Sequence, residues 1–353
     1  MKLKYLYVFL PLSIVFYILD LKIPCFFTSF LSIMPVSTSI SKCTNVLSEK
    51  LGDKLGGMLN ATTGNIPELL ICLFALKSGM FELVKAGLIG SIIGNLLFVL
   101  GISIFLGGLK YREQVFNKNI ARTNISLLFL AFTGIIIVSI YNHINSLSKN
   151  IFILSFGVSF ILIFVYILGL IFSLITHRNL FVVHTEDAFQ YQADSTIKNE
   201  SKQKLYKPLL LLILFTSVVA MESSILVSSI EYLSPRFNLS QSFLGIIVVP
   251  IAGNASEYIT AVVMALKNKV SLCIEIAVGS GMQIALFATP LIIIIGFIIS
   301  KPIGLVYNFY QIASLIISLG LSFYVFQDGK TYWLEGAILM ASYFIIALGY
   351  FFM

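Results

Sequence analysis

The sequence predicts an all-α membrane protein with eleven transmembrane helices, and three observations lead to this fold class. Of the 353 residues 58% are hydrophobic and only 11% are charged, with a mean hydropathy of +0.97, whereas about a quarter of the residues of a soluble domain are charged. Eleven apolar runs approach the roughly 20 residues that a spanning helix needs. A short polar motif occurs inside two of these runs. An ordinary soluble domain is therefore excluded.

Charged residues, prolines and asparagine clusters separate the apolar runs and set the approximate limits of each predicted helix. In chain order the predicted helices are Tyr5 to Leu21, Pro24 to Ile40, Met58 to Leu76, Phe81 to Leu109, Ile125 to Tyr141, Asn150 to Thr176, Pro208 to Ile230, Ser242 to Leu266, Ser271 to Ile299, Gly304 to Phe326 and Tyr332 to Phe352.

The runs divide the chain into four parts. Residues 1–22 form a first helix, which we expect to be retained because no small-residue cleavage site follows Leu21. Residues 23–176 and 208–353 form two groups of five helices. A polar connection, residues 177–207, separates these groups, and we expect it to be cytoplasmic.

The distribution of basic residues predicts the orientation of the chain. Most of the 23 Lys and Arg residues fall in alternate connections, beginning with Lys2 and Lys4. By the positive-inside rule the N-terminus is cytoplasmic and, with an odd number of spans, the C-terminus is outside. The net charge of +7 thus reflects contact with membrane lipid and indicates no nucleic-acid partner. Short length favours a prokaryotic plasma membrane, and no oligomeric state is indicated.

The motif Gly64-Asn65-Ile66-Pro67-Glu68 recurs as Gly253-Asn254-Ala255-Ser256-Glu257, 189 residues later. Gly90-Ser91 and Gly279-Ser280 match at the same offset. The motifs lie on the third and eighth predicted helices, five spans apart, so these helices run in opposite directions. The sequence therefore predicts two inverted five-helix repeats, an organisation whose binding sites lie near the bilayer midplane.

Each motif places a glutamate near the middle of its span, at Glu68 and Glu257. An ionised carboxylate costs about 3 kcal/mol there on translocon scales, so it needs neutralisation or hydration. One interpretation is a protonated acid that is hydrogen-bonded in a helix interface. Two such acids at equivalent positions of a repeat favour a shared cation and proton site instead.

The residues around the two glutamates are typical ligands of a hard cation. Ca²⁺ takes six to eight oxygens from carboxylates, carbonyls and water, and Asn65 and Asn254 add amide oxygens. Gly64 and Gly253, with prolines nearby, favour broken helices whose carbonyls face a cavity. Neither motif contains Cys or His, which argues against a copper or zinc site. No resident cofactor is expected; Ca²⁺ and H⁺ would be the transported ions, with other divalent cations as alternatives.

Further polar residues extend the candidate site. Ser91, Asn95, Ser280 and Gln283 lie on the spans that follow the motif helices, either facing the site or packing helices through small groups. Glu222 is also mid-span. It is either a third acid on a proton path or an acid hydrogen-bonded among Ser217, Ser223 and Ser224.

At these residues the sequence resembles the cation/proton exchanger family of the Ca²⁺:cation antiporter superfamily, whose signatures are built around G-N-A-x-E. The match is strongest over Gly245 to Pro290, and Gly56 to Gly101 is also similar. The resemblance implies eleven spans and a Ca²⁺- and proton-binding role for Glu68 and Glu257. It also implies that Ser280 and Gln283 belong to the site.

The chain departs from the family pattern at Ile66-Pro67, where Ala-Thr is usual, at Tyr258, where His is usual, and at Gly94, where Ser is usual. The interpretation that fits best is a Ca²⁺/H⁺ antiporter that exports Ca²⁺ from the cytoplasm by alternating access. A Na⁺/Ca²⁺ exchanger and a cation channel with acidic rings are the alternatives. A membrane enzyme fits least, because the mid-membrane residues supply no His and no nucleophile with a base.

Overall fold

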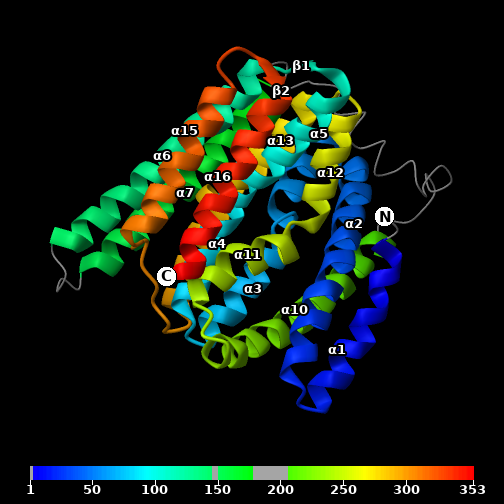
Figure 1. Ribbon diagram of the computed structural model, residues 1–353, viewed down its shortest axis with the longest axis vertical. Coiled ribbons are helices and arrows are strands. Elements are labelled where there is room, and N and C mark those ends of the chain that lie inside the picture. Colours follow the sequence, from blue (N-terminus) through cyan, green and yellow to red (C-terminus); the bar gives the residue numbers. More distant parts are fainter. Residues whose placement is uncertain (1–2, 145–149, 178–205) are drawn as a thin grey trace.

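A computed structural model describes residues 3–144, 150–177 and 206–353, and within these ranges the chain forms a bundle of mostly long helices (Figure 1). In chain order the elements are η1 (Leu3–Val8), α1 (Phe9–Ile18), α2 (Lys22–Thr63), α3 (Ile66–Lys77), α4 (Phe81–Ile93), η2 (Gly94–Val99), α5 (Leu100–Tyr111), β1 (Glu113–Val115), α6 (Lys118–Ile144), α7 (Asn150–Ile171), η3 (Phe172–Thr176), α10 (Tyr206–Arg236), α11 (Gln241–Gly253), α12 (Ala255–Leu266), α13 (Val270–Gln283), η4 (Ile284–Ala288), α14 (Thr289–Ile298), α15 (Phe309–Val325), β2 (Lys330–Tyr332) and α16 (Trp333–Phe352).

The helices have the length and composition of a multi-pass membrane protein. Among the described residues, eight helices are long and apolar enough to cross a membrane, and counting the bent pair α11 and α12 as one span makes nine. Two shorter apolar helices, Tyr5–Ile18 and Phe309–Val325, accompany them. The mostly helical membrane architecture is therefore confirmed, whereas the count of eleven spans and the inverted relation of the halves stay predictions.

Several predicted boundaries are wrong. The fifth helix was expected from Ile125 but α6 begins at Lys118, and the seventh was expected to end at Ile230 but α10 continues to Arg236. The connection expected between Ile40 and Met58 is largely helical: α2 continues to a kink at Gly52, where φ is 77° and ψ is 166°. Polar residues such as Lys and Ser have adequate helix propensity, so the helix continues beyond the apolar run, and glycine accommodates the positive φ.

The tenth helix was expected from Gly304 but α15 starts at Phe309, because Asn308 caps it.

The cap at Asn308 consists of two reciprocal hydrogen bonds with Gln311. The Asn308 side chain accepts a hydrogen bond from Gln311 N at 2.8 Å, and the Gln311 side chain accepts one from Asn308 N at 3.0 Å. Such a capping box satisfies two backbone donors that a helix start leaves free. The residues before Asn308 are held instead by serine hydroxyls, since Ser155 accepts from Leu305 N and Ser139 from Tyr307 N, both at 3.1 Å.

A short antiparallel ribbon departs from the predicted all-α class. Strand β1 pairs with β2, with Glu113 opposite Tyr332, and thereby joins the α5–α6 connection to the α15–α16 connection. Lys330 Nζ lies 2.9 Å from the Glu113 carboxylate, which also accepts a 3.0 Å hydrogen bond from the Tyr332 hydroxyl. These two donors, Lys330 foremost, hold the pKa of Glu113 below its ordinary value. Nearly all of the predicted 177–207 connection lies outside the described residues.

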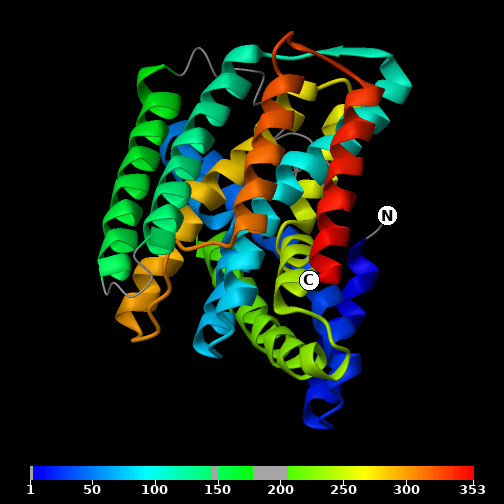
Figure 2. The same ribbon diagram turned by 60° about the vertical axis from the view of Figure 1, so that its left-hand side comes forward.

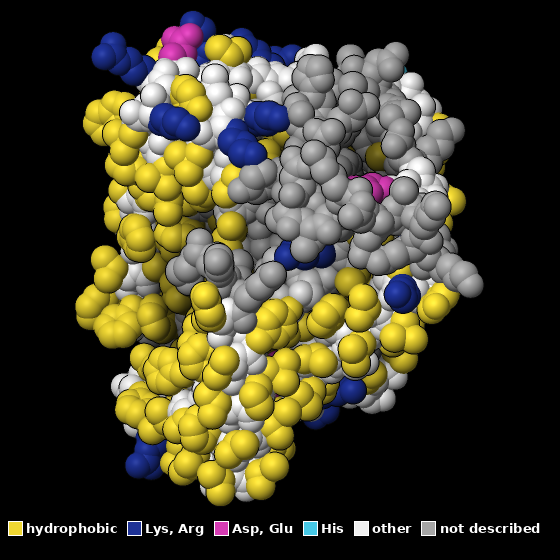
Figure 3. All heavy atoms as spheres, turned by 90° about the vertical axis from the view of Figure 1, so that its right-hand side faces the viewer, with side chains coloured by type: hydrophobic (Ala, Val, Ile, Leu, Met, Phe, Trp, Pro, Cys, Tyr) yellow, Lys and Arg dark blue, Asp and Glu magenta, His cyan; other side chains and the backbone are white. Residues whose placement is uncertain are grey.

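Helices from the two halves of the chain alternate through the bundle. Helix α2 lies along α10, and α1 covers this pair on one flank, while α6 and α7 form the opposite flank (Figures 1 and 2). Apolar side chains cover much of the outer face that Figure 3 shows, with basic side chains chiefly toward its ends. An outer surface of this kind matches a lipid environment, because hydrocarbon offers no partners to charged groups.

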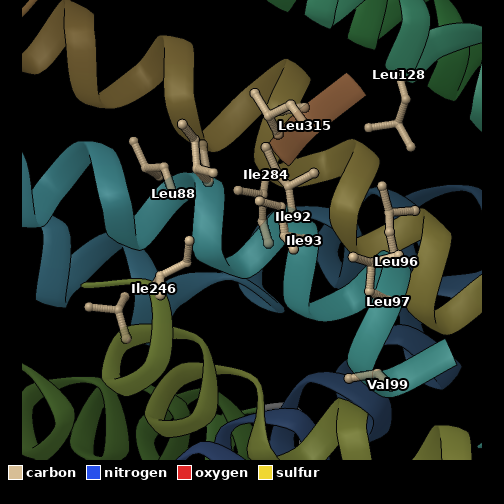
Figure 4. Close-up of a cluster of buried hydrophobic side chains, with 14 of the residues drawn as sticks. Leu88, Ile92, Ile93, Leu96, Leu97, Val99, Leu128, Ile246, Ile284 and Leu315 are labelled. Carbon is tan, nitrogen blue, oxygen red and sulfur yellow. The ribbon is translucent and has the colours of Figure 1, made fainter. Parts of the chain in front are cut away.

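The core is densest around α4 and η2 (Figure 4). Leu88, Ile92 and Leu96 from this segment are at most 3% exposed. The same hydrophobic cluster contains side chains of four other elements, namely Leu128 of α6, Ile246 of α11, Ile284 of η4 and Leu315 of α15. The spans that carry the second polar pattern of each half are thus packed into the centre of the molecule.

Helices α4 and α11 approach each other closely through glycines. A Cβ atom at Gly90 would lie 2.5 Å from Ile246 Cα, and one at Gly245 would lie 2.7 Å from Ala86 Cβ. Small residues let helix backbones come together in membranes, where van der Waals packing drives association. This contact fixes the distance between the first-half and second-half helices beside the site.

We expect Gly90→Ala to lower the thermal unfolding midpoint of the purified protein in detergent. The new methyl group must displace backbone, and overpacking of this kind costs about 1–3 kcal/mol. Gly320→Ala on α15 is the matched control, because a Cβ there meets no atom within 4 Å and alanine favours the helix. Equal midpoints for the two variants would contradict the close approach.

Candidate cation-binding site

Both polar motifs interrupt a helix in the same way. Asn65 lies between α2 and α3 with φ −95° and ψ 13°, and Asn254 lies between α11 and α12 with φ −93° and ψ 11°. A proline lies beside each break: Pro67 is in the first turn of α3 and Pro250 is near the end of α11. A proline has no N–H to donate to the preceding turn, so it favours an interruption of the helix. The second break bends the chain by 68°.

Each glutamate packs on the glycine of the other motif. A Cβ atom at Gly253 would lie 2.5 Å from the Glu68 carboxyl carbon, and a Cβ at Gly64 would lie 3.4 Å from Glu257 Oε1. The two carboxyl groups are consequently close enough to interact electrostatically. Glycine is required by the close approach at position 253, since a side chain there would displace the Glu68 carboxyl group, whereas a methyl group at position 64 would make an ordinary contact with Glu257 and a tighter one with Asn60 O.

The two glutamates differ in exposure. Glu68 is 1% exposed, whereas Glu257 is partly exposed. Glu68 lies in the first turn of α3 and Glu257 in the first turn of α12, where the positive ends of the helix dipoles favour negative charge. One carboxyl group is therefore enclosed, and the other borders a more accessible part of the site.

Three asparagine side chains link the site to the neighbouring spans through their NH₂ groups. Asn65 Nδ2 donates to Gln283 Oε1 at 2.8 Å, and Asn95 Nδ2 donates to Ser280 Oγ at 3.0 Å. A longer contact of 3.5 Å joins Asn254 Nδ2 to Ser91 Oγ. Each bond connects the first half of the chain to the second, and each fixes the orientation of an amide group.

Several acceptor oxygens of this cluster receive no hydrogen bonds from the described residues. Within the described part of the chain, both Glu68 oxygens, one Glu257 oxygen and the Oδ1 atoms of all three asparagines are buried without a hydrogen-bond partner. Buried acceptors are normally paired, because an unpaired one costs free energy. A set of unpaired carboxylate and amide oxygens in one place is the ligand set of a hard cation such as Ca²⁺.

The spans behind the cluster share an uncommon local structure. The residues after α4 form the π-helical segment η2, and those after α13 form η4, at equivalent places in the two halves. Single π-helical turns inside α-helices occur frequently at functional sites. Asn95 lies within η2 and Gln283 directly precedes η4, whereas Ser91 and Ser280 lie about one turn earlier, on α4 and α13.

Glu222 is placed differently from the alternatives that the sequence suggested. Its carboxyl oxygens meet the Ser13 hydroxyl at 2.6 Å and the Ser32 hydroxyl at 2.7 Å, rather than the serines of its own helix. Ser13 Oγ also lies 2.8 Å from Leu10 O, and Ser32 Oγ 2.9 Å from Ser29 O. The single proton of each hydroxyl is therefore shared between the Glu222 carboxyl group and a backbone carbonyl of the serine's own helix.

Two buried polar groups on α12 and α13 are not among the sequence-based candidates. The Tyr258 hydroxyl and Glu275 Oε2 are both buried without a hydrogen-bond partner among the described residues. Glu275 precedes Gly279 and Gln283 by four and eight residues and so shares a helix face with them. That spacing is the signal that could have identified it.

Comparison with known proteins places this geometry in a family. The sequence pattern of the sodium/calcium exchanger protein family matches residues 21–175 and 207–352. The chain belongs to this family. The resemblance to cation/proton exchangers, first inferred from the two motifs, is thereby confirmed at the level of the family.

Individual relatives cover nearly the whole chain. A Ca²⁺/H⁺ antiporter of Aphanothece halophytica is 38% identical over 358 residues, which cover 98% of this chain and 95% of that protein. The Ca²⁺/H⁺ antiporter ChaA of Bacillus subtilis is 37% identical, with 91% and 90% covered. The solved structure of native YfkE superposes with a TM-score of 0.84 at 31% identity, over 100% of both chains. The fold of this family member is therefore that of a known exchanger structure.

We expect Gly253→Ala to weaken cation binding much more than Gly64→Ala. The first methyl group would lie 2.5 Å from the Glu68 carboxyl carbon, whereas the second meets Asn60 O at 3.1 Å and Glu257 Oε1 at 3.4 Å. Displacing a buried carboxylate should cost about tenfold or more in affinity. Calorimetric titration with CaCl₂ in detergent measures this, with the unfolding midpoint as the control. An equal effect of both substitutions would contradict the closer approach of Glu68 to Gly253.

Proposed function

We propose that this protein is a secondary active transporter, not an enzyme, that exports Ca²⁺ from the cytoplasm in exchange for H⁺ by alternating access. The observation that carries this proposal is the pair of glutamates, Glu68 and Glu257, packed on each other's glycine among unpaired amide oxygens. Bacterial relatives named as Ca²⁺/H⁺ antiporters support the choice of ions.

Exclusive occupancy would couple the two ion fluxes. In a medium of low dielectric constant two neighbouring carboxylates cannot both stay ionised without compensation. One divalent cation or added protons can neutralise them, but both cannot occupy the same oxygens. Loading Ca²⁺ then releases protons, and protonation releases Ca²⁺, which is the chemical requirement for antiport.

The proposed metal ligands are drawn from the oxygens that lack partners. Glu68 and Glu257 supply the charge, Asn65 and Asn254 supply neutral oxygens, and the backbone at Gly64 and Gly253 lies in the helix breaks. Ser280, Gln283, Ser91 and Asn95 complete the proposed set, some of them by holding the amide groups in place. The transported ions are substrates, and no resident cofactor is part of the proposal.

Alternating access is proposed to follow from the two-part construction of the chain. The matching torsion angles at Asn65 and Asn254 and the matching π-helical segments support two equivalent halves. We propose eleven spans, with one helix before two inverted groups of five, a cytoplasmic N-terminus and an outside C-terminus in a prokaryotic plasma membrane. Rocking of one helix bundle against the other would expose the same site to either side.

The partial exposure of Glu257 supports an inward-facing conformation under this topology. With the N-terminus in the cytoplasm, α12 runs from the break toward the cytoplasmic face and α3 runs from its break toward the outside. Glu257, on the cytoplasmic side, is the accessible acid, and Glu68, on the outer side, is enclosed. Protons and Ca²⁺ would then reach the pair from the cytoplasm in this state.

Two other transport activities remain as alternatives with distinct signatures. Na⁺/Ca²⁺ exchange is favoured by the family's name alone and requires sodium for Ca²⁺ movement. A cation channel would pass current far above a turnover-limited rate and would move no protons in proportion to Ca²⁺. Proton flux measured in sodium-free proteoliposomes distinguishes both activities from Ca²⁺/H⁺ exchange.

The decisive measurement is Ca²⁺-dependent proton flux in sodium-free proteoliposomes with an imposed pH gradient. We expect wild type to exchange Ca²⁺ for H⁺ and both Glu68→Gln and Glu257→Gln to lower the rate by about 100-fold or more, because each leaves a divalent cation with one buried charge partner fewer. Glu82→Gln is the control, since Glu82 is an exposed helix-end acid paired with Lys85 at 3.6 Å. A wild type that stays silent until sodium is added would overturn the proposal.

Glu222 is proposed as an additional proton-coupling group. We expect Glu222→Gln to keep the unfolding midpoint, because a glutamine amide can donate to one serine and accept from the other, and to make the pH dependence of Ca²⁺ transport shallower. Glu222→Leu should lower the midpoint, since it leaves both hydroxyls without this partner. A pH profile of Glu222→Gln that superposes on wild type would restrict Glu222 to a packing role.

A further inference from the structure

The Tyr258 hydroxyl lies at the cation site with no assigned role. Tyr258 follows Glu257 on α12, and its ring packs beside Phe98 with 6.4 Å between the ring centroids. The ring is partly exposed, but the hydroxyl oxygen is buried without a hydrogen-bond partner among the described residues. A buried phenol normally finds a partner, so an unpaired one beside a site of unpaired oxygens requires an explanation.

Two carboxyl groups and one amide group surround this hydroxyl. Tyr258 interacts electrostatically with Glu68 and Glu257 and lies next to Asn254, whose Oδ1 atom is also unpaired. A phenol carries one O–H donor and an oxygen with free lone pairs. It is therefore the type of group that can donate to a carboxyl or amide oxygen in one state and offer its own oxygen to a cation in another.

Gly94 leaves the space in which this hydroxyl sits. A Cβ atom at Gly94 would lie 2.9 Å from the Tyr258 Oη atom and 3.6 Å from Pro250 Cβ. The backbone of Gly94 is ordinary helix, with φ −58° and ψ −44°, so no backbone torsion requires a glycine at this position. The requirement is space: a side chain at position 94 would require the Tyr258 hydroxyl to leave its present position.

Position 94 precedes Gln283 by 189 residues, the offset that relates the two motifs. Gln283 accepts the hydrogen bond from Asn65, so the equivalent side chain at position 94 would face Asn254. Glycine has no such side chain, and the Tyr258 hydroxyl occupies the region where it would begin. The polar group missing from one half is thus replaced by a tyrosine of the other half.

We propose that Tyr258 is a specificity-determining residue of the cation site, whose hydroxyl replaces the side chain missing at Gly94 and contributes a neutral oxygen to the bound divalent cation. This inference rests on the proposed function and adds a ligand to it. A neutral oxygen changes the affinity for the cation without changing the number of charges that protons must neutralise. Its loss should therefore act on cation binding and leave the exchange ratio alone.

The first test is Tyr258→Phe, which removes the hydroxyl and keeps the ring against Phe98. We expect KM for Ca²⁺ to rise about tenfold, as loss of a polar contact of this type does, with kcat, the H⁺-to-Ca²⁺ ratio and the unfolding midpoint near wild type. Tyr350→Phe is the matched control. Tyr350 is also a buried tyrosine whose hydroxyl has no partner among the described residues, but it packs on Tyr310, 4.8 Å between centroids. An unchanged KM in Tyr258→Phe would overturn the proposal.

The second test places an amide side chain at position 94 and removes the tyrosine hydroxyl at position 258. Gly94→Gln alone should lower the unfolding midpoint, because its Cβ meets the tyrosine hydroxyl. Tyr258→Ala alone should raise KM at least as far as Tyr258→Phe. In Gly94→Gln/Tyr258→Ala the amide has space, and we expect KM to return toward wild type. A double variant no better than Tyr258→Ala would overturn the equivalence of the two groups.

Calorimetric Ca²⁺ titration of the same variants in detergent separates this proposal from the proposed exchange activity. If wild type binds Ca²⁺ but moves no protons, the antiport proposal fails while the Tyr258 comparison can still be made from the dissociation constants. A tenfold higher dissociation constant for Ca²⁺ in Tyr258→Phe supports the proposal on its own. An unchanged dissociation constant overturns it even where exchange is intact.

Discussion

Two carboxyl groups held together in an apolar interior impose the main constraint on this structure. Their mutual repulsion and burial are unfavourable unless a cation or protons compensate them. The helix breaks bring Glu68 and Glu257 close together, Gly253 and Gly64 leave space beside the opposing acids, and each asparagine donates an N–H to a neighbouring span while its Oδ1 atom has no partner among the described residues. Packing of α4 on α11 then fixes the separation of the halves that carry these parts.

The halves are similar without being identical, and the differences lie at the site. Asn65 meets a glutamine amide at 2.8 Å, whereas Asn254 meets a serine hydroxyl at 3.5 Å. One acid is enclosed and the other is partly exposed. A symmetric pair of ligands would treat the two sides of the membrane alike, so these local differences would give each half of the proposed site its own environment for a bound cation.

The sequence predicts the parts of the fold that depend on local composition and spacing. Apolar length identifies most spans, and the recurrence of Gly-Asn-x-x-Glu identifies both helix breaks, because glycine and proline act on the backbone where they stand. Contacts between distant residues were not predictable in this way. The pairing of Glu222 with Ser13 and Ser32, and the space at Gly94 for Tyr258, depend on how helices far apart in sequence pack. The extension of α2 past Ile40 was missed because polar residues end an apolar run without ending a helix.

The β1–β2 ribbon links four of the helices to one another and leaves the others unlinked. It ties α5 and α6 to α15 and α16 at one end of the bundle through strand pairing and the contacts of Glu113 with Lys330 and Tyr332. Pulling those two helix pairs apart at that end would break the ribbon, whereas a rotation about an axis close to it leaves the ribbon intact. Under the proposed alternating access, the four helices that the ribbon joins would therefore move together, and large displacements would fall to helices such as α1, α2 and α10, which it does not join.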